Sequence, residues 1–460
     1  MGNSEELRQS VATPKKRREL VEWLKHPPSL DHWQEDGWRQ RCRDDFSTTA
    51  CALAALARDG EWPRTRWREA LQAWAEESLL RRSWRCMSSL LDSAPDHVLK
   101  DITRPLGWWL QSLAKTFEGH EPVFFNLIRR VLEVEKNAVI SAEDDPVSRA
   151  INHPIGHVTE AALRWWYRQQ KPLEDGQGLP DIIKHLFADL CNMHVASFRH
   201  GRVVLATHVI TLFRVDPPWA TKYLLPVFDW QQSRDEARAA WEGFLWSPRI
   251  YWPLIAAFKQ PFLATARHYS QLGRHKDQYA ALLTFAALES GETLSKSELA
   301  NATRSLPSEG LYGATQALVR ALEGAGEQRS EYWSHRVLPY VQNIWPKSRD
   351  VASPGISESL AELCVAAGDA FPEALSEIKY WLQPLELPDD VVRLLHEAQL
   401  PGQFPEPALA FLDAVIGDNA QWPPSHLKDC LDAIRHAQPN LEADGRFQRL
   451  VEYLRRHDGS

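Results

Sequence analysis

Cysteine is scarce in this 460-residue sequence, and the few residues present form no recognisable metal-binding or redox motif. No two of them stand as a C-x-x-C pair, and each lies far from the others in an apolar or helical context. Zinc ribbons, redox proteins and small disulfide-rich domains need closely spaced cysteines. We therefore expect reduced, small core residues of a cytosolic protein. The six positions are Cys42, Cys51, Cys86, Cys191, Cys364 and Cys430.

The sequence also lacks the apolar segments that direct a chain to a membrane. The polar start, Met1 to Arg8, has no apolar core of a secretory signal, and no window approaches the roughly 18 uninterrupted apolar residues of a membrane span. Gly2 does not begin a myristoylation motif, because Glu6 stands where that motif needs Ser or Thr. We expect a cytoplasmic protein without a membrane partner.

Patterns for nucleotide chemistry are missing as well. Gly176 and Gly178 are followed by Leu-Pro instead of opening a phosphate-binding turn, and no Walker A sequence occurs. The formal net charge of −8, from 53 basic and 61 acidic residues, gives no general attraction to a phosphate backbone. These absences argue against nucleotide hydrolysis, and we expect no cofactor.

Tryptophan, by contrast, is abundant, with 20 residues. Each is a large apolar plate with one N–H donor, which suits the crossings between helices. Apolar residues recur at helical spacing almost everywhere between prolines and glycines, and in 122–134 they form a single stripe. The sequence predicts an all-α fold, an α-solenoid-like array of antiparallel helix pairs similar to HEAT or TPR repeats, although no repeat has a fixed period.

Proline marks many of the expected helix starts, because its fixed φ suits the first helical position. Asp145-Pro146 and Asp216-Pro217 place an acidic residue before the proline. A second group places tryptophan there, where the ring can staple the incoming chain onto the helix: Trp62-Pro63, Trp252-Pro253, Trp345-Pro346 and Trp422-Pro423.

The segment from Arg202 to Val215 is rich in β-branched residues and would also suit a buried strand. It has no neighbouring strand candidate, and a lone strand leaves its backbone groups unsatisfied. We interpret it as a buried helix. Loops and composition then predict this organisation: a flexible tail (1–18), an N-terminal helical region (19–140), a central tryptophan-rich helical region (145–290), a partly ordered linker (291–310), a C-terminal helical region (311–400) and a terminal helical hairpin (408–456).

One candidate for metal chemistry is formed by His153, His157 and Glu160, which have metal-ligand spacing on a helix that begins at Pro154. A zinc site needs a further ligand that no nearby motif supplies. The structural alternative is that His153 or Asn152 caps the helix, Gly156 allows close packing, and Glu160 pairs with Arg164.

An aromatic turn with one guanidinium is the candidate binding site. It could stack on a base, a cofactor ring or a partner's side chain. The structural alternative is that these residues fill the space between helices and form a cation–π contact among themselves. The residues are Trp241, Trp246, Arg249, Tyr251 and Trp252.

Arginines between Arg58 and Arg85 interleave with tryptophans in a mixture that resembles a nucleic-acid surface. Acidic neighbours such as Glu69 and Glu76 offset most of that charge. The alternative is a solvated helix pair in which arginine stems cover tryptophan rings.

Three motifs carry a family resemblance: Asn152-His-Pro-Ile-Gly-His157, Arg164-Trp-Trp, and Trp241-Glu-Gly-Phe-Leu-Trp-Ser-Pro-Arg249. From about residue 145 to 278 the chain resembles an uncharacterised helical family, often found as the C-terminal part of bacterial proteins with an N-terminal sirtuin-like domain. The flanking helices, including 427–431 and 448–454, look similar too. In such phage-defence proteins the helical part is thought to recognise an invader component and control an NAD-consuming domain. That domain is missing here, which implies a separate subunit, a truncated product, or a module acting in trans.

Taken together, these features predict a non-enzymatic α-helical scaffold or sensor that mediates protein–protein interaction in a bacterial anti-phage defence system. Its partner would be another protein, either a defence effector subunit or a phage component. Two alternatives stay open: a metal-dependent hydrolase or nuclease centred on His153, His157 and Glu160, and a nucleic-acid-binding helical module.

Overall fold

A computed structural model describes residues 9–26, 34–116, 119–140, 145–289, 291, 293–417 and 422–457. The chain divides into two compact units, unit 1 from Met1 to Ser247 and unit 2 from Pro248 to Ser460. This division lies inside the region 145–290, which the sequence predicts as one segment. The difference has a physical reason, because composition marks loops, whereas a boundary between units depends on which helices contact one another.

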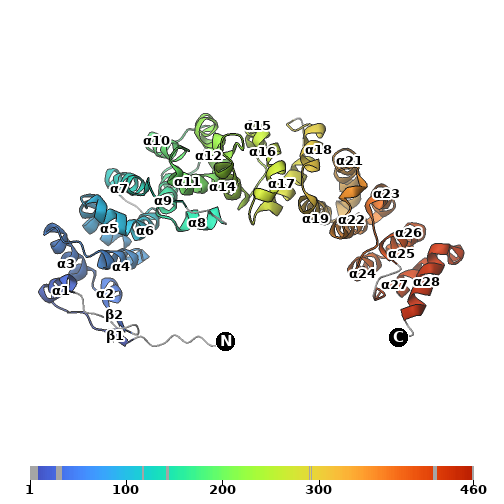
Figure 1. Ribbon diagram of the computed structural model, residues 1–460, viewed down its shortest axis with the longest axis horizontal. Helices are drawn as coiled ribbons and strands as arrows, with labels where there is room; N and C mark the ends of the chain where they lie inside the picture. Colours follow the sequence, from blue (N-terminus) through green and yellow to red (C-terminus); the bar gives the residue numbers. More distant parts are fainter. Residues whose placement is uncertain are drawn as a thin grey trace. The chain divides into compact units, whose positions relative to one another are not determined.

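Helices make up most of the described residues of unit 1 (Figure 1). Its α-helices are α1 (Arg17–Lys25), α2 (Trp38–Asp44), α3 (Phe46–Arg58), α4 (Arg64–Trp74), α5 (Glu77–Asp92), α6 (Asp96–Leu113), α7 (Glu121–Glu135), α8 (Pro146–Asn152), α9 (Pro154–Gln169), α10 (Asp181–Leu190), α11 (Arg199–Thr207), α12 (Val209–Val215), α13 (Pro217–Trp219) and α14 (Arg234–Leu245). Helices two places apart pack together, in one series α2, α4, α6 and in another α1, α3, α5, α7. α9 packs against the last helix of both series.

Unit 2 is also helical in its described residues. Its α-helices are α15 (Trp252–Ala257), α16 (Lys259–Ala264), α17 (Lys276–Glu289), α18 (Lys296–Arg304), α19 (Ser308–Gly324), α20 (Arg329–Tyr332), α21 (Leu338–Asn343), α22 (Pro354–Ala366), α23 (Phe371–Ile378), α24 (Asp389–Glu397), α25 (Leu400–Gln403), α26 (Pro405–Val415), α27 (Leu427–Ala437) and α28 (Gly445–His457). α17, α19, α22 and α24 pack in succession, and α24 also packs against α27. The expected linker 291–310 contains α18, which begins with a capping box between Ser295 and Glu298.

Short strands occur at the start of the described chain. β1 (Gln9–Val11) pairs in parallel with β2 (Gln34–Asp36), and a single bridge joins Leu385 to Ile416 in unit 2. The described part of the expected tail, residues 9–18, therefore contains β1 and the first residues of α1, because backbone pairing with β2 gives this segment partners that its own sequence does not reveal. Residues 1–8 lie outside the described residues. Because helices are the dominant element throughout the rest of the described chain, the predicted all-α class is confirmed.

The acidic helix starts are confirmed. The carboxylate of Asp145 accepts a hydrogen bond from the backbone N–H of Ser148 at the start of α8, and Asp216 accepts one from Trp219 at the start of α13. Each side chain satisfies one of the N–H groups that a helix leaves without a partner in its first turn. The following prolines lie in that turn, as expected.

The prediction that Trp-Pro pairs mark helix starts is right at two positions and wrong at two. Trp62 stacks on Trp67 with ring centroids 5.1 Å apart and so staples the start of α4, and Trp252-Pro253 begins α15. Trp345-Pro346 instead follows the end of α21, and Trp422-Pro423 lies in the loop before α27. The fixed φ of proline suits extended loops as well as first helical turns, so the dipeptide alone does not distinguish them.

The ambiguous segment is helical, as predicted. It forms α11 and α12, which meet at His208, where the backbone leaves helical geometry. Val203, Val204 and Leu205 are buried, which explains their strand-like composition. The segment is rich in β-branched residues because its helices are buried on several sides, and not because it pairs as a strand.

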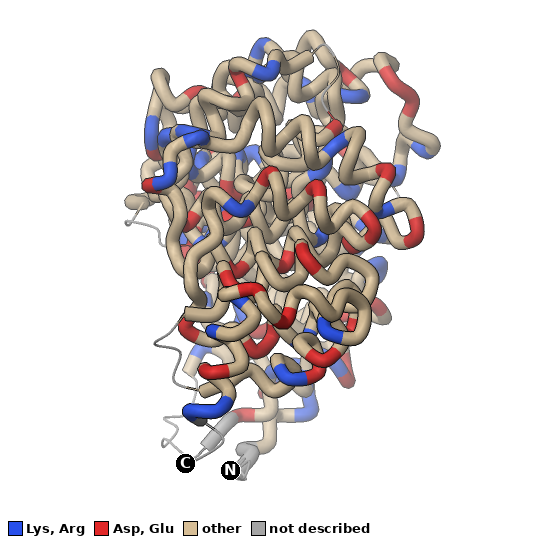
Figure 2. The backbone as a smooth tube through the Cα atoms, turned by 90° about the vertical axis from the view of Figure 1, so that its right-hand side faces the viewer, with Lys and Arg blue, Asp and Glu red and all other residues tan. Residues whose placement is uncertain are grey.

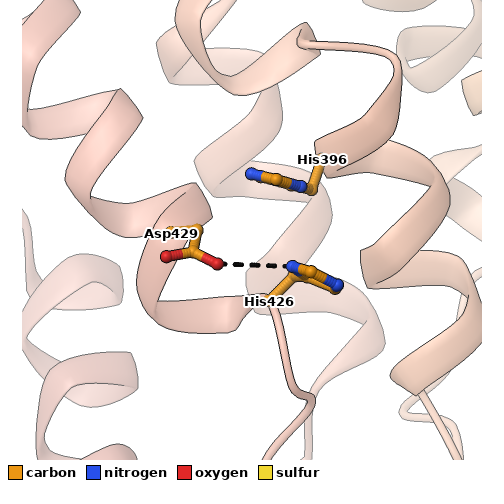
Figure 3. Close-up of side chains that lie close together, drawn as sticks. All are labelled: His396, His426 and Asp429. Carbon is orange, nitrogen blue, oxygen red and sulfur yellow. Dashed lines mark hydrogen bonds and ion pairs between the residues drawn. The ribbon is translucent and has the colours of Figure 1, made fainter.

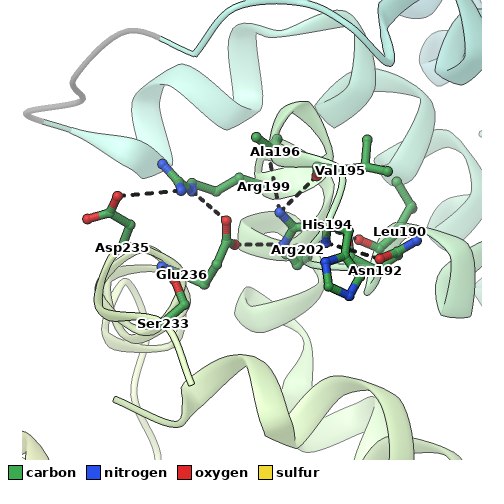
Figure 4. A network of polar contacts seen from close by, with 10 residues as sticks. All are labelled: Leu190, Asn192, His194, Val195, Ala196, Arg199, Arg202, Ser233, Asp235 and Glu236. Carbon is green, nitrogen blue, oxygen red and sulfur yellow. Dashed lines mark hydrogen bonds and ion pairs between the residues drawn. The ribbon is translucent and has the colours of Figure 1, made fainter. Parts of the chain in front are cut away.

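Arg202 of α11 is the most buried charged side chain of this segment, with 1% of its surface exposed (Figure 4). Its Nε donates to Glu236 of α14 at 2.7 Å, and Arg199 donates to the other oxygen of the same carboxylate at 2.9 Å. The guanidinium also donates to four backbone carbonyls, those of Leu190, Asn192, Val195 and Ala196. A buried charge is tolerated where it is paired in this way, so Arg202 fixes the loop after α10 against α14.

All six cysteines are free, and four of them are buried. Cys51 and Cys86 are exposed, so the expectation of core residues is wrong for these two and confirmed for the other four cysteines. No helix in the described part of the chain combines the length and apolar character that crossing a bilayer requires. Figure 2 shows Lys and Arg interspersed with Asp and Glu along the backbone.

Candidate functional site

The predicted metal ligands His153, His157 and Glu160 have separate partners. His153 precedes α9, and its Nδ1 accepts the N–H of Ile155 at 3.2 Å, so it caps the helix. Nδ1 of His157 lies 2.9 Å from Oε1 of Gln111. Glu160 pairs with Arg164 at 2.8 Å. The structural alternative is therefore confirmed for His153 and Glu160.

Gly156 packs α9 closely against α8, also as that alternative expects. A Cβ at this position would lie 1.7 Å from the carbonyl oxygen of Ala150, which leaves no room for any side chain. Among the described residues, one group of three His, Cys, Asp or Glu side chains has its ligand atoms within 4.8 Å of one another, and it is His396, His426 and Asp429. None of the predicted ligands belongs to it.

Burial sets the protonation of the histidines around α9. It lowers the pKa of His153 and of His157 to about 4, with a smaller contribution from the charge of Arg104. Burial likewise lowers the pKa of His200 to about 3, and this ring stacks on His153 with centroids 4.0 Å apart. A general acid or base works best with a pKa near the operating pH, so these neutral rings fit a packing role.

The predicted aromatic turn falls on both sides of the unit boundary. Trp241 and Trp246 belong to unit 1, and Arg249, Tyr251 and Trp252 to unit 2. Trp241 is fully buried and its Nε1 donates to the carbonyl of Phe228 at 3.1 Å, which makes it a core residue. Trp246 is 51% exposed and Arg249 is exposed, whereas Tyr251 and Trp252 are half-buried. Trp241 thus offers no surface to a ligand.

Most arginines of the arginine-rich segment are exposed, and Arg66 is the buried one. Arg66 is buried, pairs with Asp36 at 2.6 Å and lies 4.5 Å from the ring centre of Trp23. Arg68 donates to the carbonyl of Asp101 at 2.6 Å, an acceptor left open because Pro105 has no N–H to offer it. The expected solvated arginine stem over a tryptophan is therefore not what Arg66 shows, because Arg66 is buried and places its guanidinium over Trp23, which lies outside the segment.

An open groove of about 640 Å³ lies among α2, α4 and α6 of unit 1. Trp108 of α6 is its largest apolar side chain and is 53% exposed, whereas the adjacent Trp109 is fully buried. Successive residues of a helix point about 100° apart, so one of two neighbouring tryptophans must turn from the core. The other lining residues include Arg39, Gln72, Glu76, Arg104, Pro105 and Ser112.

Packing against α9 holds Trp108 in place. Its ring meets the ring of His157 edge-on, with centroids 5.7 Å apart. Gly107 allows this approach, because a Cβ there would lie 3.0 Å from the Cβ of His157 and 3.3 Å from the carbonyl oxygen of Pro154. The exposed indole is therefore packed on one side against α9 and open to solvent on the other.

The groove carries positive charge that no ion pair compensates. Arg39 and Arg104 are exposed, and neither has an ion-pair partner among the described residues. The acidic residue of the groove, Glu76, is already paired with Arg43 at 2.5 Å. In such a groove the indole can contact an apolar side chain of a ligand, and the two guanidinium groups can bind a carboxylate of the same ligand.

Sequence reasoning misses Trp108, although the pair Trp108-Trp109 is a usable signal. Both residues fit an amphipathic helix, and only one of them can face the core. The identity of the exposed one depends on where α4 and α9 contact α6, which helical periodicity does not specify.

Comparison with known proteins gives a distant relative. No family model matches the chain. An uncharacterised protein called y4cA from Sinorhizobium fredii is 23% identical over 467 residues, which cover 95% of this chain and 37% of that protein. The chain thus spans 37% of the length of the curated relative it matches, and it is similar to that protein along nearly all of its own length.

Proposed function

We propose that this chain is a non-enzymatic α-helical scaffold or sensor that binds another protein through the Trp108 groove. The observation that carries the proposal is an exposed indole, packed edge-on against His157, in a groove that is also lined by two arginines without an ion-pair partner among the described residues. Exposed tryptophan and arginine are the residues that most often dominate binding energy at protein interfaces. The matching ligand is an extended acidic segment of a partner, with an apolar side chain for Trp108 and carboxylates for Arg39 and Arg104.

Charge favours a protein partner over nucleic acid. The chain has a formal net charge of −8, and Figure 2 shows both signs mixed along the backbone. Phosphate backbones require a continuous basic surface, since their binding depends on releasing several counterions. Two arginines and one indole fit a short peptide segment better than a strand of nucleic acid.

We also propose that the helices of each unit stack as antiparallel pairs in the manner of an α-solenoid. The packing of α2, α4 and α6 in one series and of α1, α3, α5 and α7 in another supports this arrangement. Stacked pairs leave one helix of each pair on a common surface, which suits the binding of an extended segment. A cytoplasmic location fits six cysteines that are all free thiols.

The family resemblance extends the proposal to bacterial phage defence. In that setting the groove would receive either an effector subunit or a phage component. The sirtuin-like domain of the resembling proteins would then be supplied by a separate chain, or by the part of a longer protein that this sequence does not include. Co-purification from bacteria with and without phage challenge tests this context.

Fluorescence anisotropy with a labelled peptide tests the groove itself. The probe is a fluorescein-labelled decapeptide in which one leucine is flanked by glutamates, titrated with the full chain. We expect Trp108→Ala and Arg104→Gln each to weaken binding about tenfold, the loss typical of an important interface residue. A peptide with glutamine in place of each glutamate should also bind more weakly.

Trp246→Ala is the matched control, because it removes an equally exposed indole of unit 1 outside the groove. It should leave peptide affinity unchanged. A peptide that binds wild type and Trp108→Ala alike would refute the groove, as would no binding to wild type. Single-stranded DNA that binds the wild type but not Trp108→Ala would favour the nucleic-acid alternative.

A further inference from the structure

We propose that His396, His426 and Asp429 of unit 2 bind a divalent transition-metal ion, with Zn²⁺ as the representative, and that the ion fastens α24 to α27. The three side chains converge from two helices that are distant in sequence (Figure 3). His396 lies in the last turn of α24. His426 is the N-cap residue of α27, and Asp429 lies in the first turn of that helix.

The donor atoms already lie close together. One ligand atom from each residue lies within 4.8 Å of the other two. Nδ1 of His426 lies 3.3 Å from Oδ2 of Asp429, and the two imidazole rings stack with centroids 4.7 Å apart. Ligands on a tetrahedral zinc ion are about 3.4 Å from one another, given metal–ligand distances near 2.1 Å. The two rings are nearly parallel, at 11°, and the lone pairs of their nitrogens lie in the ring planes, so both rings must turn about their side-chain bonds for the donors to converge on one ion.

The backbone around the site is fixed before any metal binds. Ser425 donates both its N–H, at 2.7 Å, and its hydroxyl, at 2.9 Å, to one oxygen of Asp389. Asp389 is the first residue of α24, so this contact ties the start of α27 to the helix that carries His396. Ligands on rigid, connected elements lose little entropy on binding.

Charge around the site also admits a cation. The partly negative carbonyl groups at the end of α24 favour a positive ion near His396, whereas the partly positive N-terminus of α27 opposes it near His426. Asp429 supplies a full negative charge, and it is not engaged by a lysine or arginine in any ion pair of the described residues. The nearest arginine on α24, Arg393, is already paired with Asp390 and Glu397.

The ligand set selects the class of metal. Two imidazoles and one carboxylate suit zinc and related transition metals, whereas calcium and magnesium prefer oxygen ligands throughout. His396 and His426 are half-buried and Asp429 is exposed, so a water molecule can occupy the fourth position. If the group binds no metal, the His426–Asp429 contact serves only to stabilise the start of α27, and the two rings only pack together.

Isothermal titration of the full chain with Zn²⁺, in a buffer without chelating components, tests the site. We expect one Zn²⁺ per chain that is lost in His396→Gln and His426→Gln, and binding at least tenfold weaker in Asp429→Asn. His436→Gln is the matched control, because His436 is an exposed histidine of the same α27 outside the group. It should bind Zn²⁺ as the wild type does.

A second measurement needs no variant. Zn²⁺ should slow amide hydrogen exchange in α24 and α27 of the wild type, and Co²⁺ should give the absorption bands of a tetrahedral site. The proposal is overturned if the wild type binds no Zn²⁺, if His396→Gln and His426→Gln bind it as tightly as His436→Gln does, or if the protected amides lie elsewhere. Because the groove of unit 1 is not involved, these results are independent of the peptide experiment.

Discussion

The two units bury different kinds of polar side chain. Among the described residues, the buried charged side chains Arg66, Arg202, Asp216, Glu236 and Glu242 all lie in unit 1. The buried polar side chains of unit 2 are hydroxyls and one histidine. Fifteen of the 20 tryptophans also precede Pro248. Unit 1 is therefore held by large rings and paired charges, and unit 2 mainly by smaller apolar side chains.

This difference determines how each unit responds to change. A buried charge is stable only while its partner is present, whereas an aliphatic core gains its stability from area and shape. Serine and threonine hydroxyls bond locally to the helix backbone, as Thr284 does to the carbonyl of Ala280 at 2.8 Å. We expect unit 1 to be the more sensitive to single substitutions of polar residues and to acid.

The largest effect is expected from Arg202→Met. This change leaves the buried carboxylate of Glu236 with Arg199 alone and removes the donors for four backbone carbonyls, at a cost of about 3–5 kcal/mol. Hydrogen exchange should rise in α11 and α14 and stay unchanged in α22 and α24. Arg393→Met in unit 2 is the control, because its ion pairs are exposed and contribute about 0–1 kcal/mol. Equal losses for both variants would remove the distinction between the units.

The second largest effect is expected from acid, which should lower the free energy of unfolding of unit 1. The folded-state pKa of His157 is about 4 against an ordinary value of 6.5, so the unfolded chain binds the proton more readily. Stability is therefore full above pH 6.5 and falls as the pH drops toward 4, by about 3 kcal/mol for this residue. Urea denaturation followed by tryptophan fluorescence measures this. His157→Gln should flatten the pH dependence, and an unchanged slope would contradict the assignment.

A smaller effect is expected in unit 2 from Ser295→Ala. The hydroxyl of Ser295 accepts the N–H of Glu298, and the Glu298 carboxylate accepts the N–H of Ser295. Loss of the cap should cost about 1 kcal/mol. Faster amide exchange confined to α18 would show it. Lys296→Ala, at the first residue of the same helix, serves as the control, because its side chain takes no part in the capping box, and it should have little effect.

The smallest effect on stability is expected from Trp108→Ala. Its side chain is half-exposed, so the free energy of unfolding should change by about 0.5 kcal/mol or less. Trp109→Ala should instead cost about 3–5 kcal/mol, because it empties a buried site. Thermal unfolding of the two variants separates the roles. Comparable losses would mean that Trp108 is a structural residue.

Local features of the sequence predict the helices well and the sites poorly. Asp145 and Asp216 cap the helices that they precede because a cap needs only residues close in sequence. Trp345-Pro346 fails because a loop satisfies the same local constraint. His153 and His157 have metal-ligand spacing, yet one caps a helix and the other meets Gln111.

The sites depend on residues that are distant in sequence. His396 and His426 lie on different helices, and they meet because α24 packs against α27. Arg39 and Trp108 likewise join one groove from α2 and α6. No spacing rule links such pairs, since their separation reflects intervening helices.

The sequence by itself determined that this chain is helical, rich in buried tryptophan and without a nucleotide-binding motif. Periodicity and capping act over a few residues, so they can be read directly from the order of side chains. Only the tertiary structure decided that Trp109 is buried while Trp108 faces solvent, that Arg202 has a paired carboxylate, and that His396 meets His426. These outcomes depend on which helix faces contact one another, and that choice is made by packing across the whole unit.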